Sequence, residues 1–330
     1  MDTIAIKHSL LNDIYFQKDY INLYLKEGDS IFEFVYKEKD FFFYNIGIKK
    51  PILKIGDIEV NDGYFDLETV YGYGGIVTNS ENEIFLKKAF DSYRKECNKQ
   101  KIIAEFFRIH PYNNQPKTLI KLFDFYTFDR KTITVDTSLT KEERWSTYPS
   151  KTRNILRKCI KELTFEKSTD INSFIKLYTD TMKKNDAADF YFFSKDYFQS
   201  LLALENIELY VVKLGNTIIS SSFFMFSEKI GHYHLSANDY AYRKFNANYF
   251  ILDSIFDIAH SNGCEKFHLG GGRTNQKDDS LLKFKLKFSP ITSNFNIGGI
   301  IHEKDIYNVY NDLWINSNTI NPAFFLKYRL

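Results

Sequence analysis

Three consecutive glycines followed by a basic stretch form the part of this sequence best suited to bind an anion. Gly270, Gly271 and Gly272 follow the apolar segment 267–269. Glycines at the end of a strand let backbone N–H groups approach a ligand closely. Downstream, the segment 284–288 adds Lys285 and Lys287 as positive charge. A surface turn before a solvated helix is the alternative, but the fifteen glycines run three in a row only here, so we expect a ligand site.

A second cationic cluster lies on a predicted helix and consists of Lys151, Arg153, Arg157 and Lys158. Arg153 and Arg157 are four residues apart, so they share one face of that helix. Arginine can bind phosphate through two parallel hydrogen bonds, which suits a diphosphate or a nucleic-acid backbone. The formal net charge is only +2, so a local cluster must hold any anion. An ordinary solvated helix face is the alternative.

Two histidines alternate with a tyrosine in the predicted strand His232–Ala237. Alternation places His232 and His234 on one face of the strand and Tyr233 on the other. Histidine titrates near neutral pH, so His234 could act as a proton acceptor; a core histidine is the alternative. No third ligand is suitably spaced to complete a metal site with these histidines, so we expect no bound metal. Asp239, just past the strand, could orient an amine.

An aromatic glycine loop, Tyr71-Gly72-Tyr73-Gly74-Gly75, joins a predicted strand to a helix in the first half of the chain. Its two tyrosines could stack on a base or a sugar; a loop packed on its own aromatic rings is the alternative. The sequence contains no Gly-x-Ser-x-Gly elbow, P-loop or His-Glu-x-x-His motif.

The elements that must position these residues read as a mixed α/β fold with a repeated order. Both halves contain the series β-β-β-α-β-α-β, which indicates an internal duplication. In the first half the elements are 31–37, 41–48, 64–70, 81–97 (helix), 101–107, 116–123 (helix) and 131–135. In the second they are 208–213, 217–226, 232–237, 249–261 (helix), 266–269, 279–287 (helix) and 293–301, after helices from Asp170 and at 197–204. We therefore expect domains at 1–140 and 141–330, with roughly the last 30 residues packed back on the first domain.

Composition is that of a globular protein of two domains, with 330 residues of which 26% are charged. Three scattered cysteines predict no disulfide framework and no zinc site. The chain has no run of 18 apolar residues and opens with no signal peptide. A cytoplasmic protein is expected, which could still act on a membrane-linked substrate at the inner face of the membrane.

The order of elements resembles that of the GNAT acyltransferase fold, and the chain resembles the FemAB-like branch, in which two such domains are fused. The resemblance rests on the stretches 68–75, 107–111, 145–158, 233–236 and 270–289. It implies two tandem GNAT-like domains. It further implies transfer of an acyl or aminoacyl group to the amine of a cell-envelope precursor.

The resemblance also assigns binding residues. The segment 243–248 takes the place of the Arg/Gln-x-x-Gly-x-Gly/Ala loop that holds the CoA pyrophosphate, so Arg243, Asn246 and Asn248 become cofactor-binding candidates. Both motif glycines are replaced by asparagine, which tolerates positive φ but hinders a close backbone approach. Arg108 joins Tyr71 and Tyr73 as substrate-binding candidates. The catalytic centre is expected around His234, Asp239 and Lys285, with Tyr233 replacing His234 if the strand turns the other way.

The leading function is therefore an N-acyltransferase of polysaccharide biosynthesis, with acyl-CoA as donor and a nucleotide- or lipid-linked amino sugar as acceptor. The chain lacks a long charged heptad segment that would form a helical arm, which favours acyl-CoA. The alternative donor is aminoacyl-tRNA, with a peptidoglycan-type acceptor. A nucleotide- or glycan-binding module without activity is the third reading.

Overall fold

The computed structural model describes residues 8–318 and 322–330, and it forms two compact units. Unit 1 comprises the described residues up to Leu11, Tyr15–Asp129 and Asn294–Leu330; unit 2 comprises Asn12–Ile14 and Arg130–Ser293. Unit 1 is discontinuous because the chain returns to it after completing unit 2. Strands β8 (Phe125–Asp136) and β14 (Thr292–Ile301) contribute residues to both units.

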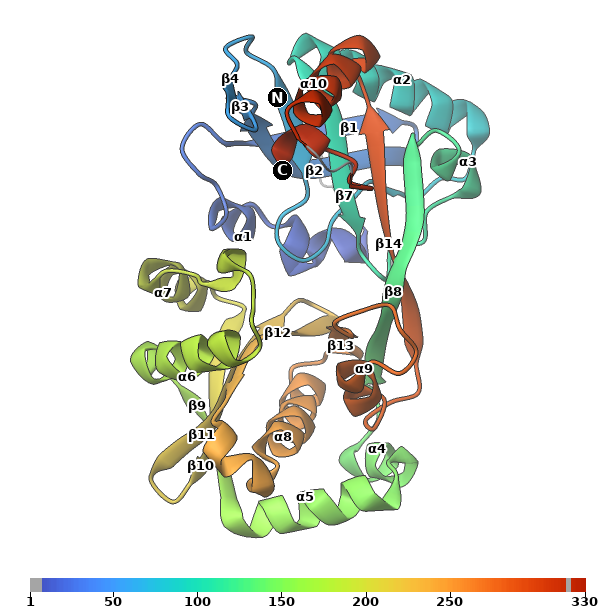
Figure 1. Ribbon diagram of the computed structural model, residues 1–330. Helices are drawn as coiled ribbons and strands as arrows, with labels where there is room; N and C mark the ends of the chain where they lie inside the picture. The colour runs from blue at the N-terminus through green and yellow to red at the C-terminus, as the bar shows by residue number, and fades with distance from the viewer. Residues whose placement is uncertain (1–7, 319–321) are drawn as a thin grey trace. The chain divides into compact units, whose positions relative to one another are not determined.

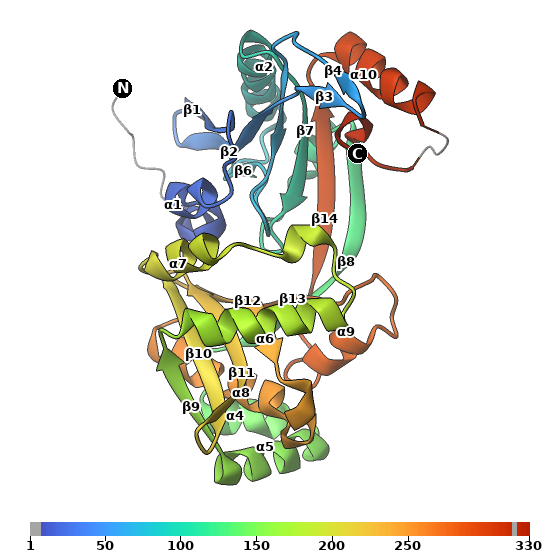
Figure 2. The same cartoon turned by 60° about the vertical axis from the view of Figure 1, so that its left-hand side comes forward.

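Unit 1 is built on strands in the order β1 (Ser30–Glu38), β2 (Phe41–Pro51), β5 (Phe65–Glu68), β7 (Ile102–Ile109) and β14. The β5–β7 pair is parallel, and the other neighbours are antiparallel. Along β7, Ile102 and Phe107 lie in the core under α2 (Glu83–Lys99), and Ile103 lies in the core under α10 (Lys304–Asn316). The two helices therefore cover opposite faces of the strands (Figure 2).

Unit 2 has the strand order β8, β13 (Lys266–Gly271), β12 (Ile230–Asn238), β11 (Thr217–Phe226), β10 (Ile207–Leu214) and β9 (Leu163–Ser168). Only the β12–β13 pair is parallel among the registers given for these strands. Helices α6 (Ile171–Lys184) and α7 (Lys195–Ala203) cover one face, where Phe223 packs on Phe174 and Phe198. Helix α8 (Ala247–Ser261) covers the other face, which includes Phe224 (Figure 1).

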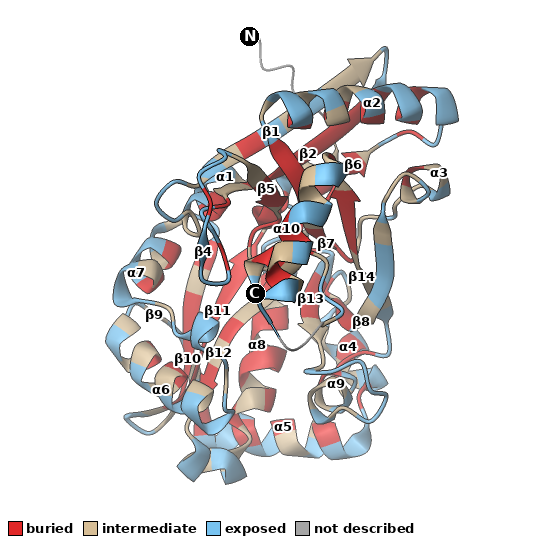
Figure 3. Ribbon diagram, turned by 45° about the horizontal axis from the view of Figure 1, so that its top comes forward, coloured by how far each residue is buried: buried red, intermediate tan, exposed pale blue. Residues whose placement is uncertain are grey.

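Local signals in the sequence explain these helices. Asp170 caps α6 by accepting from the Ser173 N–H, as predicted, and Asn82 caps α2 by accepting from Phe85. Helix α8 is mostly buried, whereas α5 (Ser150–Glu162), which packs on α8, keeps an exposed face (Figure 3). The predicted mixed α/β fold is confirmed. Strand β9 and helix α10 are among the elements that were not predicted.

The remaining elements are short. They are η1 (Ser9–Asn12), η2 (Ile14–Phe16), α1 (Lys18–Asn22), β3 (Lys54–Ile55), β4 (Ile58–Glu59), β6 (Val77–Thr78), α3 (Lys117–Ile120), α4 (Lys141–Thr147), η3 (Asp189–Tyr191), η4 (Tyr240–Phe245), α9 (Ser280–Lys285) and η5 (Lys327–Arg329). No helix among the described residues is long and apolar enough to span a membrane. All three cysteines are buried free thiols.

Candidate active site

The parallel strands β12 and β13 of unit 2 separate soon after they begin. Their register contains three pairs and ends at His232 and His268. Beyond that point β12 continues beside β11, and β13 continues beside β8. The facing edges of the two strands are therefore no longer paired with each other, and a ligand backbone could follow them.

A pocket of about 1130 Å³ opens beside the diverging strands. Its walls come from α6, the end of β12, η4, the first turn of α8 and α9. Five cations line it, namely Lys176, Lys184, Lys213, Arg243 and Arg273, together with the carboxylates Asp170, Asp180 and Asp239. The excess of positive charge suits an anionic ligand, and the volume is ample for a small-molecule site.

The loop before α8 keeps the backbone shape that the expected glycine would give. Asn246 has φ 55° and ψ 37°, a left-handed conformation that asparagine tolerates. Its amide side chain donates to the Lys244 carbonyl at 3.0 Å. The buried thiol of Cys159 on α5 donates to the Phe245 carbonyl at 3.3 Å and so links the loop to α5. Asn246, Ala247 and Asn248 all line the pocket, so the N-terminus of α8 faces it.

Tyr233 and Lys285 lie together on the α8 side of the sheet. The Lys285 ammonium is 5.9 Å from the centre of the Tyr233 ring and donates to the Gly271 carbonyl at 2.7 Å. The hydroxyls of Ser236 and Ser222 lie near the Tyr233 hydroxyl and act to lower its pKa, and the Ser222 hydroxyl donates to that of Ser236 at 2.9 Å. Tyr233 also lines the pocket. The pair thus offers two hydrogen-bond donors held by neighbouring groups.

Burial shifts the pKa of both side chains. Lys285 is only 6% exposed, and desolvation lowers its pKa to about 7; Asp279 opposes this shift and Arg130 adds to it. Desolvation raises the pKa of Tyr233, while the two serine hydroxyls act in the opposite direction. Tyr233 is therefore protonated at neutral pH, whereas Lys285 gains and loses its proton near neutral pH.

The triple-glycine segment presents carbonyl groups to its surroundings, where we expected N–H groups to face a ligand. The Gly271 carbonyl accepts from Lys285, and the Gly272 carbonyl accepts from Arg130 at 3.0 Å. A Cβ on Gly271 would lie 2.8 Å from the Arg130 side chain, and one on Gly272 would lie 2.5 Å from Asp279. The glycines thus make room for a network of charged side chains. The pocket is lined by the nearby residues Arg273 and Phe284, and not by the glycines or Lys285 themselves.

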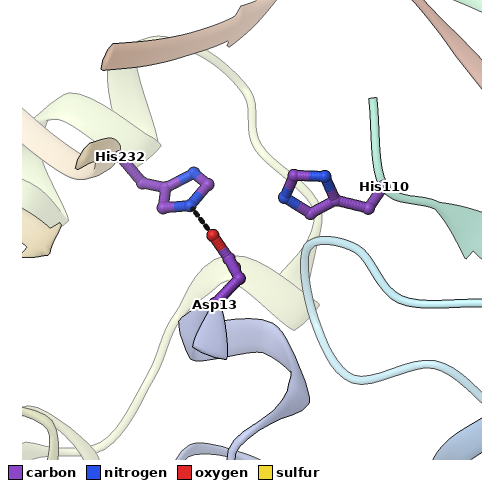
Figure 4. Close-up of side chains that lie close together, drawn as sticks. All are labelled: Asp13, His110 and His232. Carbon is purple, nitrogen blue, oxygen red and sulfur yellow. Dashed lines mark hydrogen bonds and ion pairs between the residues drawn. The ribbon is translucent and has the colours of Figure 1, made fainter. Parts of the chain in front are cut away.

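His234 lies on the other face of β12. Its Nε2 is 3.4 Å from the Tyr197 hydroxyl of α7, and burial together with His232 lowers its pKa to about 3. On the same face, His232 Nε2 is 2.7 Å from the Asp13 carboxylate, with both side chains fully buried (Figure 4). The structure therefore brings Tyr233 and Lys285 together and places His234 apart from them. Asp239 caps η4 by accepting from the Ala241 N–H at 2.9 Å, at the rim of the pocket.

The three candidates of unit 1 lie in a packed region. Tyr71 stacks on Tyr24 at 5.8 Å, and Tyr73 makes an edge contact with Phe295 at 5.1 Å. The Arg108 guanidinium lies over the Phe106 ring at 5.2 Å. These contacts hold the aromatic glycine loop within unit 1.

The predicted basic helix is α5, but its cations differ in exposure. Lys151 and Lys158 are exposed, and Arg157 is exposed and donates to Asn154 at 2.8 Å. Arg153 is partly buried and donates to the carbonyls of Trp145 and Tyr148. Arg153 therefore fastens α4 to α5, so its replacement would cost stability as well as charge.

Comparisons with known proteins agree with this geometry. Residues 150–278 match the family model described as an acetyltransferase (GNAT) domain. The crystal structure of FemX has a TM-score of 0.73 with 14% identity, covering 90% of this chain and 94% of FemX. The GNAT resemblance is confirmed over residues 150–278, and the likeness to FemX shows that nearly the whole chain shares the fold of that protein. The GNAT domain contains the pocket-lining part of β12, η4 and the first turn of α8.

Two further structures share the fold at lower similarity. L-PGS from Bacillus licheniformis has a TM-score of 0.51 and 12% identity, covering 86% of this chain and 89% of its own. The C-terminal domain (DUF2156) of a protein described as a lysylphosphatidylglycerol synthetase from Agrobacterium fabrum has a TM-score of 0.50 and 13% identity, covering 81% and 84%. No curated protein matches the sequence.

The sequence analysis missed three residues that support the site, namely Ser222, Arg130 and Asp279. Together with Ser236, they lie against Tyr233, the glycine carbonyls and the loop before α9. One signal was available: the run Ser220-Ser221-Ser222 interrupts an otherwise apolar strand. Buried polar side chains are usually hydrogen-bonded, so such a run indicates a network within the sheet.

Proposed function

We propose that this protein is an N-acyl or aminoacyl transferase whose activated donor binds in the pocket of unit 2. The divergence of β12 and β13 beside the N-terminus of α8 carries the proposal. An extended donor arm would follow the free strand edges, and its phosphate groups would meet the first N–H groups of α8 together with Arg243 and Lys184.

Tyr233 and Lys285 are the residues we assign to the reacting carbonyl. When an amine attacks the carbonyl carbon, negative charge grows on the oxygen, and fixed donors in a buried site stabilise that charge strongly. Ser222 and Ser236 position the Tyr233 hydroxyl, and the Gly271 carbonyl positions the Lys285 ammonium. Asp239 at the rim is the carboxylate that we assign to orienting the amine. His234 would act only on an amine that approaches from the α7 side.

Acyl-CoA is the donor we favour, and the acceptor we propose is the amine of a cell-envelope precursor. The GNAT domain match supports the donor, and the likeness to FemX and to the two lysylphosphatidylglycerol synthetase structures supports the envelope class. A nucleotide- or lipid-linked amino sugar fits the cationic pocket. We place the reaction in the cytoplasm, where a lipid-linked acceptor would be met at the inner membrane face.

One observation favours aminoacyl-tRNA as the alternative donor. Asn246 and Asn248 occupy the positions of the two glycines of the CoA loop, and their side chains restrict how closely a pyrophosphate can approach the backbone. A charged tRNA presents its aminoacyl ester at a single-stranded end and needs no pyrophosphate contact there. The two donors therefore make opposite demands on this loop.

The test is product formation with each donor. Purified protein is incubated with acetyl-CoA or with charged tRNA and a panel of amino-sugar acceptors, and acylated products are measured by mass spectrometry. We expect product with one donor class, loss of product in Lys285→Met, and retention in Lys283→Met, which changes an exposed lysine of the same helix. Binding of a donor without product in any combination would instead support a non-catalytic binding module.

A further inference from the structure

A second cavity lies in unit 2, on the α4–α5 side, and shares no lining residue with the donor pocket. It measures about 400 Å³ and is lined by Lys141, Glu142, Trp145, Ser146, Arg153 and Arg157. The lining thus combines an indole ring with three cations and one carboxylate. This volume falls within the range of small-molecule sites.

The aromatic wall of this cavity is held rigidly. The Trp145 Nε1–H is 3.0 Å and 3.1 Å from the two carboxylate oxygens of Asp253, a residue of α8 that is 1% exposed. Trp145 also packs against the core of unit 2. Its polar edge is therefore anchored in the interior, while the ring itself lines the cavity.

The cations of the cavity differ in how firmly they are held. Arg153 is bound to two backbone carbonyls, and Lys141 pairs with Asp257 at 2.6 Å while its ammonium lies 5.9 Å from the Trp145 ring centre. Arg157 is exposed and bonded to Asn154, one turn back on α5. Arg157 can thus turn to a ligand at little cost, with Lys141 and Arg153 adding positive potential.

We propose that this cavity is a separate binding site for a nucleotide, with the base stacked on Trp145 and a phosphate bound by Arg157. A flat aromatic ring stacks on any base, and arginine binds phosphate through charge-assisted hydrogen bonds. The cavity admits one base with its phosphate, which favours a mononucleotide moiety over a strand of nucleic acid. Because Asp253 joins Trp145 to α8, an occupied site would also be in contact with the helix whose first turn lines the donor pocket.

The fluorescence of Trp145 provides a direct assay. The chain has two tryptophans, and Trp314→Phe removes the other, which is buried in unit 1. The full chain carrying this change is titrated with AMP, UMP, ribose 5-phosphate and inorganic phosphate. We expect saturable quenching by both nucleotides, with ribose 5-phosphate and phosphate bound at least about tenfold more weakly, because they lack a base to stack.

Variants assign the signal to this cavity. Arg157→Gln should weaken nucleotide binding about tenfold or more, Arg157→Lys should restore part of it, and Lys161→Gln, an equal charge change at an exposed position of α5, should have no effect. Arg243→Gln, which alters the donor pocket, should leave the quenching curve unchanged. Absence of saturable quenching, equal binding of phosphate alone, an unaffected Arg157→Gln, or loss of the signal in Arg243→Gln would each overturn the proposal.

Discussion

Among the described strands, each unit contains one parallel pair, and the two pairs end differently. In unit 1 the β5–β7 register runs to Glu68 and Phe106, after which Thr69 N–H donates to the Phe106 carbonyl. Gly74 then continues the pairing, since its N–H donates to the Arg108 carbonyl at 2.8 Å and its carbonyl accepts from the His110 N–H at 3.0 Å. In unit 2 the β12–β13 register ends after three pairs.

The difference suits the two parallel pairs to different roles. The aromatic glycine loop of unit 1 occupies the edge of β7 that a ligand backbone would otherwise use. Gly72 permits this, with φ +112° and a position so close to Tyr15 that a Cβ would lie 2.2 Å from the ring. In unit 2, β12 lines the pocket beyond the end of its register with β13, through Tyr233 and Asn238. We therefore expect donor binding in unit 2 and a structural role for the loop of unit 1.

The largest expected effect is loss of turnover when Lys285 of unit 2 is replaced by an uncharged residue. Lys285→Met should lower kcat by about 10²–10³-fold, because one fixed donor to the developing oxyanion is removed. The pKa of Lys285 lies at about 7, so the protonated form that donates is depleted as pH rises. Hence wild-type kcat should contain a limb that falls through about pH 7 and disappears in Lys285→Met. Steady-state kinetics across pH would contradict the assignment if both enzymes gave the same profile.

The next largest effect tests the packing of the aromatic glycine loop of unit 1. Gly72→Ala should lower the free energy of unfolding by about 2–4 kcal/mol, because a strained φ and a steric clash with Tyr15 act together. Gly215→Ala is the matched control: Gly215 also has positive φ (+58°), but its Cβ would meet nothing within 4 Å. Urea denaturation should show a smaller loss there, of about 1 kcal/mol. Equal losses would mean that the packing against Tyr15 contributes little.

Glu105 is a buried ionisable group of unit 1 that we expect to affect stability, in contrast to Lys285, which we expect to affect turnover. Glu105 accepts from Asn45 and from Tyr93, each at 2.6 Å, and burial raises its pKa from 4.5 to about 7. Between these two pH values the folded state binds a proton that the unfolded state has released. The contribution of Glu105 to the free energy of unfolding therefore falls as pH rises from 4.5 to 7, by about 2–3 kcal/mol.

Replacing Glu105 tests that linkage. Glu105→Gln should flatten this part of the pH–stability curve and leave kcat unchanged, the reverse of what is expected for Lys285→Met. Chemical denaturation at several pH values provides the measurement. An unchanged slope would show that Glu105 is already ionised in the folded protein below pH 7.

The smallest effect concerns the loop before α8. Asn246→Gly should change the free energy of unfolding by less than about 1 kcal/mol, since the left-handed conformation suits both residues. If CoA is the donor, the same change should raise CoA affinity several-fold by freeing the backbone, as measured by calorimetry. Asn246→Val, which disfavours positive φ, should weaken binding. Equal CoA affinities of the valine and glycine variants would show that the conformation of this loop does not affect donor binding.

Sequence periodicity and capping signals predicted most elements, but not those that lack either. Helix α6 was predicted from Asp170 and the apolar spacing that follows, and the β10–β11 hairpin from Gly215-Asn216. Strand β9 has only two strongly apolar residues, Leu163 and Phe165, and pairs with β10 along one edge only, so no pattern revealed it.

The sequence indicated several residues of the candidate site, but it did not indicate which of them lie together in the folded protein. Alternation placed His234 and Tyr233 on opposite faces of β12, yet which helices cover each face depends on long-range packing. The GNAT resemblance indicated the loop before α8, and Asn246 has the conformation that the replaced glycine would have. The role of the triple glycine could not be predicted, because Arg130 and Lys285 reach its carbonyls from residues about 140 and 14 positions away.

The central claim is that the donor lies along the diverging strands of unit 2, and hydrogen–deuterium exchange tests it most directly. The full chain is compared with and without saturating desulfo-CoA, and in a parallel arm with a non-hydrolysable aminoacyl-tRNA analogue. One of the two should protect the amides of residues 233–238 and 246–249 and leave residues 69–75 of unit 1 unchanged. Protection confined to residues 69–75, or no protection in unit 2 with either ligand, would contradict the account.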